Sequence, residues 1–124
     1  MKKYIEIYLI VLMVCFLLIG CVSNKFTYDE TIPQEEQSEL QFSATMKVIK
    51  FNGNDVNWRT KSYSGTIIVN IPAGNHYLVC YYSDGSWYTD NMTVTYNFLP
   101  MKTYKLDTFF EGREARAIVK ELKK

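Results

Sequence analysis

The sequence MTVTYNF, residues 92–98, alternates apolar and polar side chains at every position. In an extended chain, positions 92, 94, 96 and 98 would point to one face, and the two threonines and Asn97 would point to the other. This period-two pattern is typical of a β-strand with one buried face. The stretch therefore predicts a sheet that covers a core on one side.

Similar alternation predicts further strands on both sides of this stretch. They cover residues 40–48, 66–71 and 104–110, and a shorter strand begins at Val56 and Trp58. Residues 76–83 are apolar on both parities, which favours a central strand covered on both faces. The alternation changes phase near Val48-Ile49, which predicts either a β-bulge or a strand switch there.

Turn signals separate these segments. Asn52-Gly53 and Asp84-Gly85 are strong hairpin signals, because both residue pairs tolerate positive φ. The sequence Ile71-Pro72-Ala73-Gly74 fits a type I turn at which the chain reverses, and Gly112 marks another turn.

The C-terminal segment allows two interpretations. Helical spacing is matched by four apolar residues, Ala115, Ile118, Val119 and Leu122. The sheet context before Gly112 favours a closing strand instead, and we expect the strand. Short strands joined by closely spaced turns predict an all-β fold, a small antiparallel β-sandwich of about seven strands over residues 40–124.

The first 20 residues have the anatomy of an export signal. A basic start with Lys2 and Lys3 precedes 14 residues without a charge, from Ile7 to Gly20. That run is short for a permanent membrane span, which needs about 20 apolar residues. We therefore expect a signal peptide over residues 1–20, with an uncleaved anchor as the alternative.

Leu18-Ile19-Gly20-Cys21 closely resembles the lipobox of bacterial lipoproteins. The resemblance implies cleavage between Gly20 and Cys21 and a diacylglyceryl group on the Cys21 thiol. It also implies a domain held outside the cytoplasm on the cell membrane or the outer membrane, with the membrane as partner through the lipid on Cys21. Several acyl chains would make that attachment stable.

The segment after the lipid site is polar and acidic. Residues 21–39 contain five carboxylates around Pro33 and predict a solvated tether, with a short helical turn at residues 34–38 as an option.

A second resemblance rests on three stretches. Ile32-Pro33-Gln34-Glu35-Glu36, Asn52-Gly53 with Val56 and Trp58, and Ile71-Pro72-Ala73-Gly74-Asn75-His76 are similar to a group of small uncharacterised bacterial lipoproteins. That group is in turn similar to PEGA-type surface modules in its Pro-x-Gly turn. The resemblance covers most of residues 32–110 and implies a compact extracytoplasmic sandwich without catalytic residues.

Charge and cysteine content exclude several classes of protein. Without Lys2, Lys3 and Glu6 the chain carries equal numbers of acidic and basic side chains, which does not favour nucleic acid binding. Cys15 lies in the signal and Cys21 is the lipid site, so Cys80 has no disulfide partner in the domain. We expect Cys80 to be a small buried residue.

The polar residues do not point to catalysis. His76 follows a turn with no nucleophile or orienting carboxylate nearby in sequence, and we expect it to satisfy the turn backbone. His76 and Cys80 alone cannot complete a zinc site. Asp84, Asp90 and Asp107 are a weak candidate for a carboxylate pair. We therefore expect no enzyme activity, no metal and no cofactor.

Aromatic residues are the better candidates for a site. Trp87 and Tyr88 lie beside the Asp84-Gly85 turn, where exposed rings could contact a protein partner or stack on sugar rings. Trp58, by contrast, is expected in the core. The leading expectation is a non-catalytic surface or interaction domain, and the alternative is a carbohydrate or cell-wall binding module that uses Trp87 and Tyr88.

Overall fold

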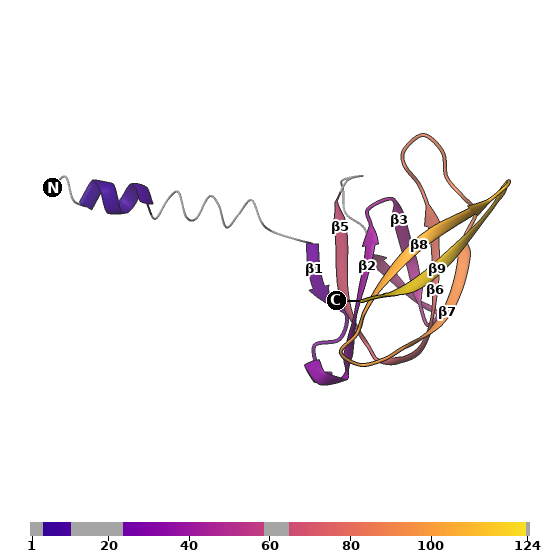
Figure 1. The fold of residues 1–124 in the computed structure, drawn as a ribbon, viewed down its shortest axis with the longest axis horizontal. Helices are drawn as coiled ribbons and strands as arrows, with labels where there is room; N and C mark the ends of the chain where they lie inside the picture. The colour runs from indigo at the N-terminus through magenta and orange to yellow at the C-terminus, as the bar shows by residue number, and fades with distance from the viewer. Residues whose placement is uncertain (1–3, 11–23, 59–64, 124) are drawn as a thin grey trace.

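The computed structural model describes residues 4–10, 24–58 and 65–123. Residues 4–10 form a short helix with exposed side chains (Figure 1). No helix in these described ranges has both the length and the apolar character needed to cross a bilayer.

Nine strands in the described ranges form two sheets (Figure 1). The elements are β1 (Asn24–Thr27), η1 (Gln34–Glu36), β2 (Gln37–Ser43), β3 (Met46–Phe51), β4 (Asn54–Trp58), β5 (Thr66–Pro72), β6 (Gly74–Tyr82), β7 (Met92–Phe98), β8 (Thr103–Glu111) and β9 (Glu114–Leu122). The five-stranded sheet has the order β1-β5-β2-β8-β9, and the four-stranded sheet has the order β4-β3-β6-β7. The predicted all-β sandwich is confirmed, with nine strands in place of about seven. Two of the strand pairs, β1/β5 and β2/β8, are parallel.

Several local predictions are confirmed. β7 covers the segment that decided the fold class, and its two ends, Met92 and Phe98, are buried. Asn52 and Gly53 have φ of 52° and 83°, as a two-residue hairpin between β3 and β4 requires. The pairing register shifts between Val48 and Lys50, which is the predicted bulge. The C-terminal segment is a strand, because β9 pairs with β8 along its whole length.

The predicted single strand at 40–48 is wrong. The chain turns at Ala44 and Thr45, so that β2 belongs to one sheet and β3 to the other. The Ala44 amide donates to the carbonyl of Gly65, and the Thr45 carbonyl accepts from the amide of Ser83, which ties the turn to neighbouring segments. Apolar alternation continues through this turn because both strands face the same core.

The segment at Pro72 also changes sheet. β5 lies in the five-stranded sheet and β6 in the four-stranded sheet, so the Pro-x-Gly turn joins two strands that are not paired with each other. β6 is central, between β3 and β7, as expected, but it is not covered on both faces. Leu78 and Cys80 are buried, whereas Tyr77 is exposed.

The predicted tether is wrong for residues 24–39. β1 pairs with β5, and the ring of Tyr28 lies 4.8 Å from that of Phe51 and 5.7 Å from that of Trp58. η1 is the short helical turn after Pro33, and β2 already begins at Gln37. This polar stretch is therefore part of the sandwich, because its aromatic side chains complete the core.

Candidate functional site

The β6–β7 connection is built around Asp84. Its carboxylate oxygen Oδ1 accepts hydrogen bonds from the backbone amides of Ser86, at 2.8 Å, and Trp87, at 3.1 Å. These bonds lower the pKa of Asp84, so its carboxylate stays charged at neutral pH. A bridge between Ser83 and Tyr88 closes the turn. The chain does turn at Asp84-Gly85, with φ of 92° at Gly85, but the predicted two-residue hairpin is wrong: four residues, 84–87, separate the bridged Ser83 and Tyr88, because the Asp84 carboxylate binds the amides of Ser86 and Trp87.

Trp87 belongs to a cluster of three rings. Its ring centroid lies 5.3 Å from that of Tyr82 and 5.5 Å from that of Phe110, and these two rings are 5.6 Å apart. Trp87 and Phe110 nevertheless stay 49% and 46% exposed. The cluster joins the end of β6 to the tip of the β8–β9 hairpin, so two segments far apart in sequence build one aromatic surface.

Tyr82 is the inner member of this cluster. Burial raises the pKa of its hydroxyl, and the nearby charge of Asp84 raises it further. The hydroxyl lies 3.4 Å from Asp84 Oδ2, and the backbone amide of Tyr82 donates to Thr89 Oγ1 at 2.9 Å. These contacts hold the ring against which Trp87 packs.

A cleft of about 650 Å³ opens beside two of the three rings, those of Trp87 and Phe110. Residues 87–92 form one wall, and the β8–β9 tip, with Phe110 and Arg113, forms the other. We call it the aromatic cleft. Asp90 and Asn91 contribute polar groups to its lining. Its size and mixed lining suit a ligand that offers an apolar face and hydrogen-bonding groups.

The two residues singled out in the sequence share this cleft but do not form a flat platform. Trp87 is partly exposed, as predicted, and Tyr88 is 76% exposed. The described ring contacts of Trp87 are with Tyr82 and Phe110, not with Tyr88. Phe110 and Arg113 were not anticipated. The Phe109-Phe110 pair before the Gly112 turn was the available signal, since two adjacent aromatics at a strand end cannot both face the core.

His76 has the structural role expected of it. Because the Pro72 carbonyl can only accept, Nε2 carries the proton and donates to it at 2.6 Å. Nδ1 then accepts from the side-chain amide of Asn52 at 2.7 Å, while Asn52 Oδ1 accepts from the Tyr77 amide. Both ring nitrogens of His76 are therefore occupied, one by the turn after Pro72 and the other by the β3–β4 hairpin.

Cys80 lies in the core, and Asp107 contacts its neighbours in sequence. Cys80 is fully buried, and burial raises the pKa of its thiol to about 12, which removes the reactive thiolate at neutral pH. Asp107 accepts from the Thr108 amide and lies 3.9 Å from Lys105 Nζ. Within the described ranges, no three His, Cys, Asp or Glu side chains are grouped as metal ligands would be.

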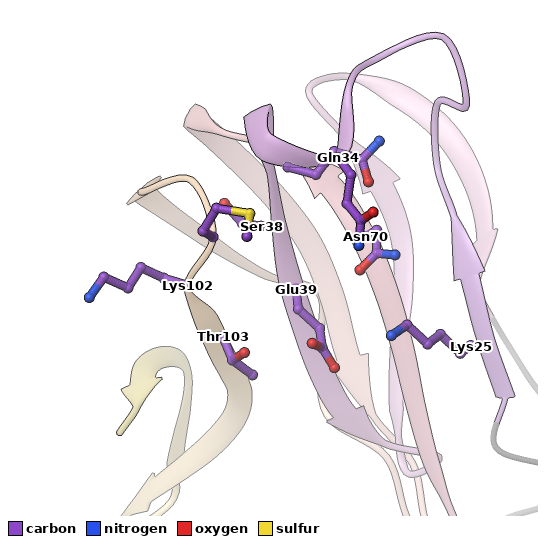
Figure 2. A pocket seen from close by; sticks show the side chains of 9 residues that line it. Lys25, Gln34, Ser38, Glu39, Asn70, Lys102 and Thr103 are labelled. Atoms are coloured by element: carbon purple, nitrogen blue, oxygen red, sulfur yellow. The ribbon is translucent and has the colours of Figure 1, made fainter. Parts of the chain in front are cut away.

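A second, polar hollow of about 270 Å³ lies where β1, η1, β2 and β5 approach the start of β8. Figure 2 shows Lys25, Glu39 and Asn70 around it. Ser38 Oγ donates to the Leu99 carbonyl at 2.7 Å, and Gln37 donates to the carbonyl of Ile32 at 2.7 Å. The first contact ties β2 to the segment before β8, and the second ties β2 to the segment before η1. The sequence had not singled out this hollow.

Gly20 and Cys21, the predicted cleavage and lipidation residues, lie outside the described residues. No protein-family model, curated protein or solved structure matches the chain. The likeness to small lipoproteins and PEGA-type modules therefore stays a prediction. The assignment of function depends on the signal sequence and on the aromatic cleft.

Proposed function

We propose that this chain is a bacterial lipoprotein, attached to a membrane through lipid on Cys21, that presents a non-catalytic β-sandwich as an interaction domain. The observation that carries the interaction role is the half-exposed Trp87, held by Tyr82 and Phe110 at the edge of the aromatic cleft. Rigid aromatic rings of this kind dominate many binding surfaces, because they bury a large area with little loss of side-chain entropy.

The non-catalytic part of the proposal is supported by the environments of the reactive groups. His76 is engaged through both ring nitrogens, Cys80 is buried with a raised pKa, and Asp84 holds a turn. A general base or nucleophile needs a free partner in reach of a substrate. Each of these three groups is already occupied by the fold.

The anchoring part of the proposal is tested by metabolic labelling with an alkyne fatty acid. The protein expressed with its own signal should incorporate the label, and Cys21→Ser should abolish incorporation. Cys15→Ser is the matched control, because Cys15 lies in the apolar run that precedes the lipobox-like residues. Equal labelling of the wild type and Cys21→Ser would contradict lipidation at Cys21.

The second candidate function is binding of cell-wall glycan in the same cleft. It is favoured by the polar groups of Asp90, Asn91 and Arg113 beside the Trp87 ring, which is the mixture that sugar recognition uses. Soluble peptidoglycan fragments should then change the emission of Trp87 and lose this effect in Trp87→Ala. An unchanged spectrum at saturating fragment concentration would remove this candidate.

A further inference from the structure

The start of β1 and the aromatic cleft lie at the same end of the sandwich. The strand pairings place Asn24 opposite Ile67, Ile67 opposite Phe42, and Phe42 opposite Leu106, in one row across β1, β5, β2 and β8. β2 and β8 are parallel to each other and antiparallel to β5, whereas β1 is parallel to β5. From this row, the N-terminal end of β1 and the part of β8 that follows Leu106 therefore point in the same direction.

The other wall of the cleft belongs to this end as well. The Ser83 amide donates to the carbonyl of Thr45, two residues beyond the end of β2, and Trp87 packs against Phe110. Figure 1 shows the β6–β7 connection and the β8–β9 tip on the upper side of the view, and β1 running downward from its start at the left edge. We call this end of the sandwich, with residues 84–91 and 109–116, the aromatic end.

Chain length limits how far the lipid site can lie from the start of β1. Cys21 precedes Asn24 by three residues, and three residues span at most about 11 Å. Phe110 follows Leu106 by four residues, which in a strand is about 13 Å. The β8–β9 tip therefore extends from the shared row at least as far as the lipid-bearing residue could. A bilayer that holds the acyl chains of Cys21 lies within reach of the tip.

The exposed side chains at this end are those that membrane interfaces favour. Four large aromatics are 46% to 76% exposed there: Trp87, Tyr88, Phe109 and Phe110. Amphipathic Trp and Tyr rings concentrate at the level of lipid headgroups, where one edge is apolar and the other is hydrated. The opposite end exposes Leu99 and Met101 but lies on the far side of the shared row from Cys21.

Charge argues for an apolar contact instead of an electrostatic one. Residues 84–91 and 109–116 contain two basic side chains, Arg113 and Arg116, and twice as many acidic ones. Arg116 also hydrogen-bonds Glu111. Attraction to anionic headgroups needs a basic excess, which this end lacks. The matching partner is the interface of a zwitterionic bilayer.

We propose that the aromatic end docks onto the membrane that holds the lipid, with Trp87 and Phe110 at the headgroup level. This proposal rests on the proposed lipidation of Cys21 and makes the bilayer surface the partner of the proposed interaction domain. It gives the domain a fixed orientation, with the aromatic end towards the bilayer and the Leu99 end away from it.

Quenching of Trp87 fluorescence tests this orientation. The full-length gene is expressed with its signal, and the lipidated protein is reconstituted into phosphatidylcholine vesicles whose acyl chains carry bromine. Brominated lipid should reduce the Trp87 emission at least twofold, and aqueous iodide should quench it less than in detergent. Trp87→Phe keeps only the buried Trp58 and gives its contribution for subtraction. As the matched control, Leu99→Trp in the Trp87→Phe background should be quenched by iodide and not by the lipid.

The outcomes separate the two proposals. Mass spectrometry of the same sample shows whether Cys21 is lipidated, and an unmodified Cys21 overturns the proposed function. A lipidated protein whose Trp87 stays open to iodide and insensitive to brominated lipid overturns the docking alone. Quenching of Trp87 by peptidoglycan fragments without quenching by lipid would also overturn the docking and assign the cleft to glycan.

Discussion

Trp58 and Trp87 show how the same residue type takes two roles in one small domain. Trp58 is 5% exposed and contacts the rings of Phe26, Tyr28 and Phe51. It continues the parity of Val56 after the Asn52-Gly53 hairpin, which is why the sequence predicted its burial. Trp87 follows a turn that Asp84 caps, and there the sheet leaves half of its ring uncovered.

This difference predicts unequal losses of stability. Trp58→Ala should lower the free energy of unfolding by about 3 to 5 kcal/mol, because it empties a space between three aromatic rings. Trp87→Ala should lower it by about 1 kcal/mol, because only the contacts with Tyr82 and Phe110 are lost. Urea unfolding followed by circular dichroism measures both. A larger loss for Trp87→Ala would contradict the assignment of core and surface.

Cys80 predicts a loss of stability at alkaline pH. Its thiol has a pKa of about 12 in the folded protein against a usual value of 9.0, so above pH 9 the unfolded state releases the proton first. The free energy of unfolding should therefore fall steadily between pH 9 and 12, by a total on the order of a few kcal/mol. Below pH 9 the Cys80 thiol has no such effect on stability, because it keeps its proton in both the folded and the unfolded state.

Comparison with Cys80→Ala isolates the contribution of the Cys80 thiol to this pH dependence, because ionisation of tyrosine and lysine affects the wild type and the variant equally. The difference in unfolding free energy between the wild type and Cys80→Ala should stay constant below pH 9 and then change steadily in favour of Cys80→Ala. A difference that is independent of pH up to 12 would show that the Cys80 thiol is not desolvated.

At the scale of elements, local signals located the strands, but the assignment of strands to sheets required tertiary structure. β7 and the β3–β4 hairpin follow from alternation and from Asn52-Gly53. The turn at Ala44 and Thr45 has neither Gly nor Pro and is held by hydrogen bonds to the Gly65 carbonyl and from the Ser83 amide, which no local pattern contains. β1 is only four residues long and depends on its parallel pairing with β5. Phe110 contacts Trp87, which lies 23 positions earlier in the sequence, so no local pattern predicts that the two rings meet.

β1 predicts where the independently folding unit begins. A chain that starts at Asn24 should melt cooperatively without lipid or disulfide. Cys80 is the cysteine that remains in this chain, and its thiol is free. A chain that starts at Leu40 lacks β1, the Tyr28 ring and the first residues of β2. It should be less stable by about 3 kcal/mol or fail to fold. Thermal melts of the two chains compare them, and equal melting temperatures would return residues 24–39 to the role of a tether.

The β8–β9 hairpin predicts different effects for its two adjacent phenylalanines. Phe109 and Phe110 are equally exposed, but alternation places them on opposite faces of β8, and only Phe110 contacts the Trp87 ring. Phe110→Ala should shift the Trp87 emission to longer wavelength and raise its iodide quenching about twofold. Phe109→Ala is the matched control and should leave both nearly unchanged. Equal shifts in the two variants would show that the ring cluster does not hold Trp87.

At the scale of the whole molecule, the sandwich has two unlike ends. The signal and the lipid site stay predictions, and they rest on a local motif, Leu18-Ile19-Gly20-Cys21, because export machinery reads contiguous sequence. The aromatic cleft could be predicted only in part, through Trp87 and Tyr88, because its second wall comes from another hairpin. The direction of the strands then places this cleft at the end of the sandwich where β1 begins, and no single segment encodes that arrangement.

The central claim is that the sandwich is attached to a membrane through Cys21, and mass spectrometry of the protein extracted from membranes tests it most directly. The mature chain should begin at Cys21 and carry the added mass of a diacylglyceryl group, with or without a further acyl chain on its amino group. A chain that still joins Gly20 to an unmodified Cys21 in wild-type membranes would contradict the account.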